Sequence, residues 1–222
     1  MQKMIAGFLV ALIVLFAGQA FALESLSQNE FTTAESLDPG MTQAGIFLTA
    51  GNNYLSYYPA FRYGLGSFFE VGARVGAISM DVSAPLIYGI DGPTTNKLSA
   101  LVGADVKYQL IKQTEDIPVD MAVDLGIDAT SISGNNVSEL SFATTVSRGF
   151  TLTETGYKLT PYGGIELSSQ YSSSDYINNN ENKTNLYAFG GVEWKLSQKF
   201  MMIAEIKSGS STLGGFGIRF EY

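Results

Sequence analysis

The chain closes with the stretch TLGGFGIRFEY, Thr212–Tyr222, in which apolar and other side chains alternate strictly from Gly215 onward. Phe216, Ile218, Phe220 and Tyr222 share one parity, and the positions between them are glycine or charged. Successive side chains of a β-strand point to opposite faces of the sheet. The stretch therefore predicts a strand with one apolar face that ends on an aromatic ring.

This ending resembles the C-terminal assembly signal of bacterial outer-membrane β-barrel proteins, whose last strand alternates hydrophobic residues and closes on an aromatic one. The resemblance is to this broad class and identifies no subfamily. It implies a monomer that the barrel assembly machinery inserts into the outer membrane, with membrane lipid around it. Phe216, Ile218, Phe220 and Tyr222 would form the assembly signal.

The start of the sequence predicts export. Lys3 supplies a short positive region, residues 5–17 are almost entirely apolar, and Ala20-Phe21-Ala22 offers a small-x-small cleavage site, as in a secretory signal peptide. The apolar run is shorter than the ~20 residues of a membrane-spanning helix. Residues 1–22 are therefore predicted to be a cleaved signal helix rather than an anchor. Residues 23–40 are polar and aperiodic, so we expect a flexible periplasmic segment there.

Composition excludes several classes of protein. After removal of the leader, 12 basic residues remain against 21 acidic ones, which gives a net charge of −9. This charge argues against nucleic acid as a partner. The chain has no Cys and therefore no disulfide or thiolate metal site. After the leader, the sequence has no run of about 18 apolar residues, the length that indicates a transmembrane helix.

Residues 41–222 alternate with a period of two in ten segments, which predicts an all-β, up-and-down antiparallel transmembrane barrel. The predicted strands are 41–50, 55–63, 68–79, 98–110, 118–129, 138–148, 157–170, 184–195, 199–207 and 212–222. Each is close to the ~9–11 residues that cross a bilayer when tilted. Eight strands would leave alternating runs unused. Twelve would need a hairpin within residues 80–97, where Pro85 and Gly92-Pro93 intrude.

The connections between these strands differ systematically in length. The long polar connections, such as 80–97 and 171–183, all fall at odd positions in the series, whereas connections at even positions are short. Outer-membrane barrels have short periplasmic turns and longer extracellular loops. An even number of strands would place both termini in the periplasm and these loops outside the cell.

Charged residues predict the face that lines the lumen, because a lipid-facing Lys or Arg at the membrane midplane costs ~2–4 kcal/mol. The residues assigned to the lumen are Arg62, Glu70, Arg74, Asp105, Lys107, Asp120, Asp124, Asp128, Glu166, Glu193, Lys195, Glu205, Lys207, Arg219 and Glu221. A barrel of this size is almost filled by side chains, so we expect these charges to pair and largely close the lumen. The alternative is a narrow pore, in which Asp120, Asp124 and Asp128 would favour cations.

Aromatic residues on the outward parity gather near one end of the predicted strands. They are Tyr63, Phe69, Tyr108, Phe150, Tyr157, Trp194, Phe200 and Tyr222. Aromatic rings prefer the membrane–water interface, so we expect a periplasmic girdle. A soluble periplasmic β-sandwich is a further alternative. It would share the period of two, but it would bury the apolar face of each strand.

Catalysis has little support in the sequence. The chain contains no His, which removes Ser-His-Asp triads, His general bases and most zinc sites. We predict no enzyme, cofactor or metal site. The expected role is membrane integrity or surface contact, or passage of small, possibly cationic solutes. The alternative is a surface binding module that uses loops 80–97 and 171–183.

Overall fold

The computed structural model describes residues 31–222 apart from 52–53, 83–94, 133–134, 154–155 and 175–180. The predicted signal peptide and residues 23–30 lie outside the described residues. The described chain forms β1 (Thr42–Gly51), β2 (Tyr54–Gly66), β3 (Phe69–Val82), β4 (Thr95–Ile111), β5 (Asp120–Ile132), β6 (Asn135–Ser147), β7 (Phe150–Thr151), β8 (Lys158–Ser174), β9 (Glu181–Lys195), β10 (Phe200–Ser208) and β11 (Thr212–Glu221). No helix among these residues is long and apolar enough to cross a membrane.

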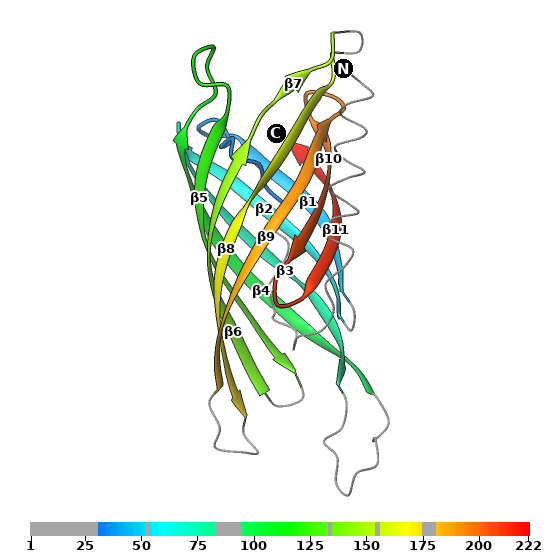
Figure 1. Ribbon diagram of the computed structural model, residues 1–222. Helices are drawn as coiled ribbons and strands as arrows, with labels where there is room; N and C mark the ends of the chain where they lie inside the picture. Colours follow the sequence, from blue (N-terminus) through cyan, green and yellow to red (C-terminus); the bar gives the residue numbers. More distant parts are fainter. Residues whose placement is uncertain (1–30, 52–53, 83–94, 133–134, 154–155, 175–180) are drawn as a thin grey trace, which may run out of the picture.

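Ten of these strands close into an antiparallel barrel (Figure 1). Neighbours in sequence pair with each other, and the pairing of β6 with β8 completes the wall. The C-terminal strand β11 pairs with β1, so that Ile46 lies opposite Ile218. The short strand β7 pairs only with the start of β8 and adds nothing to the ring. The prediction of a ten-stranded up-and-down barrel is confirmed.

The two ends of the barrel differ. The end with the short connections and Tyr222 is called the turn end, at the top of Figure 1, and the opposite end is called the loop end. At the loop end the strands are longer than predicted, since β3 runs to Val82 and β4 begins at Thr95, within the predicted loop 80–97. Likewise, β8 ends at Ser174 and β9 begins at Glu181, within 171–183. The ladder continues there because strand pairing satisfies backbone groups whatever the side-chain pattern.

The side chains are arranged in the reverse of a water-soluble fold. Large apolar side chains such as Val75 (56% exposed), Ile127 (54%) and Leu186 (64%) stand on the outside. Charged side chains such as Glu70 and Lys207 are fully buried inside. A soluble sandwich would bury the first set and hydrate the second. This wall therefore requires an apolar solvent, as a bilayer provides.

The interior is not only charged, because aromatic and aliphatic side chains form a cluster within it. The rings of Phe47 and Tyr58 stack with centroids 5.5 Å apart and belong to a buried cluster with Ile203. A glycine faces this cluster at position 217, where a Cβ atom would collide with the ring of Phe47. Inward glycines thus provide the room that the rings occupy. Parity analysis assigned charges to the lumen and missed these apolar layers.

The described part of the segment 23–40, which the sequence predicted to be flexible and periplasmic, is held in place by the barrel. Residues 31–34 are buried inside the barrel, with Phe31 2% exposed. The chain enters β1 through Gly40, which has a φ of 82° and whose N–H donates to the carbonyl of Gly64 at 2.8 Å. A segment without hydrophobic period can be held by its backbone, and such contacts leave no periodic signal in the sequence.

Candidate functional site

The charged residues assigned to the lumen all lie on the interior face. Thirteen of the fifteen are nearly or completely buried, and their side chains are at most 10% exposed. Lys195 and Glu221 are half-buried at the turn end, where their side chains lie 3.3 Å apart and line a cavity. Parity was sufficient to place them because a strand offers only two faces.

One group of charges lies on the wall formed by β2–β5. Arg62 contacts Glu70 at 2.6 Å and Asp105 at 2.9 Å. Arg74 bridges Asp105 and Asp128, donating to both carboxylate oxygens of Asp128 at 2.7 and 2.5 Å. These are strong, charge-assisted contacts. Breaking one would leave a buried charge without its partner, which is costly.

A second group lies on the opposite wall, β8–β11. Lys207 pairs with Glu166, and Arg219 pairs with Glu193. Glu205 accepts a hydrogen bond from the Tyr162 hydroxyl at 2.9 Å. Each wall is therefore cross-linked by its own contacts, and all three contacts of this second wall reach across an intervening strand.

The three aspartates of β5 were the main argument for a cation pathway. Asp120 accepts hydrogen bonds from the Gln109 side chain at 2.8 Å and from the Gln113 N–H at 2.7 Å. Asp128 is held by Arg74 in the bidentate contact, and Asp124 is 4% exposed. At least two of the three carboxylates are thus engaged in contacts that shape the wall, which weakens the case for a cation pathway.

Sequence reasoning also missed some polar residues of the interior. Glu139 is 3% exposed, and Gln43 and Gln109 are buried as well. All three have the inward parity of their strands. Extending the parity argument to every polar residue of each strand would have found them.

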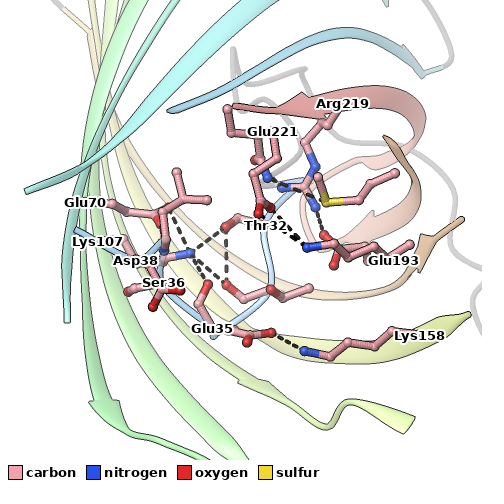
Figure 2. Close-up of a pocket in the computed structure, with 15 residues that line it drawn as sticks. Thr32, Glu35, Ser36, Asp38, Glu70, Lys107, Lys158, Glu193, Arg219 and Glu221 are labelled. Atoms are coloured by element: carbon pink, nitrogen blue, oxygen red, sulfur yellow. Dashed lines mark hydrogen bonds and ion pairs between the residues drawn. The ribbon is translucent and has the colours of Figure 1, made fainter. Parts of the chain in front are cut away.

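Residues 31–37 fill the lumen at the turn end, and Lys107 makes the largest number of contacts to them. Its ammonium lies 2.9 Å from Thr32 Oγ1, 3.0 Å from the carbonyl of Thr33 and 2.9 Å from that of Glu35. The same ammonium pairs with Glu70 at 2.8 Å. Figure 2 shows the segment crossing between the two charged walls.

A polar cavity of about 120 Å³ lies at the turn end. The segment lines one side of it, with Glu35 paired to Lys158 at 2.5 Å. Arg219 stands on the other side (Figure 2), and Lys195 also lines the cavity. A volume of this size holds a few water molecules, since a water occupies ≈ 30 Å³ of the liquid.

Several solved structures are similar to this barrel. The β domain of the Bordetella autotransporter BrkA superposes with a TM-score of 0.51, at 10% identity over 83% of this chain and 100% of that domain. An outer membrane channel of Pseudomonas putida F1 superposes with a TM-score of 0.43, at 9% identity over 89% of this chain and 100% of the channel. The N-terminal barrel domain of Pseudomonas aeruginosa OprF superposes with a TM-score of 0.37, at 10% identity over 84% of this chain and 100% of that domain. No family model and no curated protein matches the sequence. In its fold, the chain is an outer-membrane β-barrel.

The exterior of this outer-membrane barrel carries the predicted aromatic girdle residues. Seven of the eight are at least 36% exposed, and Phe200 is half-buried against Phe220, with centroids 5.3 Å apart. Tyr157 and Trp194 meet edge to face at 6.3 Å. Phe69 lies directly opposite Tyr108 across the β3–β4 ladder. Aromatic residues of this set therefore lie beside one another across strands at the turn end.

The residues of the predicted assembly signal lie on the outside of the barrel seam. Phe216 and Phe220 are 43% and 39% exposed, and Tyr222 is 63% exposed. The backbone of Tyr222 exchanges two hydrogen bonds with Thr42, at 2.8 and 3.0 Å. The last residue thus takes part in closing the wall, as well as presenting a ring to the exterior.

Proposed function

We propose that the protein resides in a bacterial outer membrane as a barrel that is closed at rest and acts in membrane integrity or surface contact. The observation that carries the proposal is the seating of residues 31–37 inside the lumen, with Phe31 buried. An ion that crosses the barrel needs a continuous water path. A filled lumen with paired charges opposes such a path, because desolvating an ion is expensive.

The direct test is single-channel recording of the refolded protein in planar bilayers. We expect no stable openings over the whole voltage range. Heat-modifiable gel migration of the same sample would establish that the barrel is folded. Steady ohmic openings in the untreated protein would contradict the proposal.

A narrow pore is the second candidate, and one feature favours it. The walls behind the segment are lined by charges such as Arg62, Asp105 and Glu166, so displacement of the segment would expose a surface that water can wet. Under this candidate, Asp124→Asn should reduce the preference for cations. An unchanged reversal potential would show that Asp124 does not determine the ion selectivity.

Surface binding through loops 80–97 and 171–183 is the remaining alternative. The strand extensions up to Val82 and Ser174 would carry these loops away from the membrane, while 83–94 and 175–180 lie outside the described residues. Shortening each loop should abolish binding to whole-cell surfaces and leave heat-modifiability unchanged. Binding that survives both deletions would exclude the loops as the site.

A further inference from the structure

We infer that the lumen is a binding site for an extended polypeptide segment, and that residues 31–38 are its resident, exchangeable ligand. The ligand class is a peptide recognised through its backbone and one aromatic side chain. This inference goes beyond the closed barrel proposed above, because it assigns to the inner wall a recognition function that simple filling would not require.

The wall recognises the backbone of the segment at seven groups. The donors and acceptors on the wall come from β3, β4, β6, β10 and β11. The bonds join Glu205 to Phe31 N–H (2.9 Å), Arg219 to Phe31 C=O (3.3 Å), Lys107 to Thr33 and Glu35 C=O (3.0 and 2.9 Å), Ser147 to Ala34 N–H (3.1 Å), Gln109 to Ser36 N–H (3.0 Å) and Glu70 to Leu37 N–H (2.9 Å). Every peptide carries such groups, so these contacts accept many sequences.

One side chain of the segment has a shaped receptor. The Phe31 ring lies 5.0 Å from the ring of Phe47, which stacks in turn on Tyr58. Gly215 forms another side of this receptor, since a Cβ atom there would collide with the Phe31 ring. A buried ring in a close-fitting pocket is a typical binding anchor. The site therefore selects an aromatic residue at this position.

The wall charges that hold the segment also have partners within the barrel. Glu70 keeps Arg62, Glu205 keeps the hydroxyl of Tyr162, and Arg219 keeps Glu193. If the segment left, each of these charges would therefore keep a partner. If the segment itself had supplied one half of these ion pairs, its departure would leave buried charges unpaired, at a high cost in free energy. The receptor is preorganised, which lowers the cost of binding a replacement. This is the reason to regard the segment as a ligand.

The resident segment has one advantage over any free peptide. It continues directly into β1 through Gly40, and such a tether gives it a high effective concentration. A peptide added from outside should therefore compete well only when the fit of the resident segment is weakened. Truncating a buried Phe to Ala removes its packing contacts and leaves a cavity. Phe31→Ala is therefore a suitable change to weaken the fit of the resident segment.

The experiment uses the full chain and a synthetic peptide. The chain has no Cys of its own and carries the substitutions Phe31→Ala and Ser147→Cys. The peptide has the sequence of residues 31–38, with Cys in place of Ala34. This position is chosen because the N–H of Ala34 contacts Ser147. Disulfide formation reports occupancy. We expect efficient cross-linking, reduced at least about 10-fold when the chain retains Phe31. The double variant Ala34→Cys/Ser147→Cys should form the internal disulfide and serves as the geometric control.

Peptide variants test the mode of recognition. Replacing Phe by Ala in the peptide, or methylating the backbone nitrogens of its Ser36 and Leu37 positions, should reduce cross-linking about 10-fold or more. Replacing the Thr33 side chain should change it little. If heat-modifiable gel migration shows that the Phe31→Ala chain does not fold, a chain with Ser36→Pro is used in its place. Proline lacks the N–H that donates a hydrogen bond to Gln109.

Two results would overturn the inference. The first is an internal disulfide that forms while no peptide cross-links, which would make the segment a permanent part of the barrel. The second is equal cross-linking by the normal, Phe-to-Ala and methylated peptides, which would mean unspecific reaction of an exposed thiol.

Discussion

Lys107 and Glu70 form an ion pair of 2.8 Å inside the barrel, and each of them also holds the N-terminal segment. The Lys107 ammonium contacts two carbonyls of the segment, and a Glu70 oxygen accepts the Leu37 N–H at 2.9 Å. The pair thus couples the stability of the wall to the seating of the segment. The first prediction concerns this coupling.

Lys107→Met should destabilise the barrel by about 3–5 kcal/mol, because Glu70 loses one of its two cationic partners in a buried site. Urea unfolding of the refolded protein in detergent micelles or vesicles measures the change. Lys112→Met is the matched control, since Lys112 is exposed in the turn after β4 and should matter by less than about 0.5 kcal/mol. Equal effects of the two substitutions would contradict the assigned role of the pair.

Gly215→Val should displace the N-terminal segment while leaving the charged walls in place. The added side chain would occupy the space of the Phe31 ring. A Thr33→Cys reporter, buried in the parent protein, should then react faster with a membrane-impermeant maleimide. Gly214→Val is the control, because a Cβ atom at Gly214 meets nothing within 4 Å. Unchanged labelling in the Gly215 variant would show that the segment tolerates the loss of this space.

Leu125→Arg should cost about 2–4 kcal/mol in a lipid bilayer, because it places a charge on the outward face of β5. Leu125 is 50% exposed near the middle of that strand. Ile117→Arg should cost little, since Ile117 is exposed in the turn before β5, outside the strands that form the wall. Reversible unfolding in vesicles measures both variants. A large cost at Ile117 together with a small one at Leu125 would reverse the assignment of membrane depth.

Removal of Phe220–Tyr222, or Tyr222→Asp, should impair insertion and leave degraded or periplasmic protein. The last residue bonds to Thr42 across the seam, and Phe220 packs on Phe200. Membrane fractionation of cells that express each variant measures the effect. Tyr222→Phe keeps the ring and should assemble normally. Normal assembly of the deletion would mean that the ending is dispensable.

Local sequence was sufficient for the wall of this barrel. A strand has two faces, so alternation alone placed Val75 outside and Glu70 inside. The same alternation put Trp194 and Tyr222 on the exterior. Strand ends were less accurate at the loop end, where β4 and β8 reach 17 residues each, because polar strands can pair without a hydrophobic signal.

The contents of the lumen depended on tertiary structure. Alternation indicated that Arg74 and Asp128 face inward, but the register of β3, β4 and β5 brought these residues together across 54 positions of sequence. Residues 31–37 carry no hydrophobic period, although Phe31 and Leu37 are apolar. Seven of the hydrogen bonds that hold them involve backbone groups, which every residue shares. The direction in which a side chain points is thus a local property of the strand, whereas its partner is chosen only when distant strands close the ring.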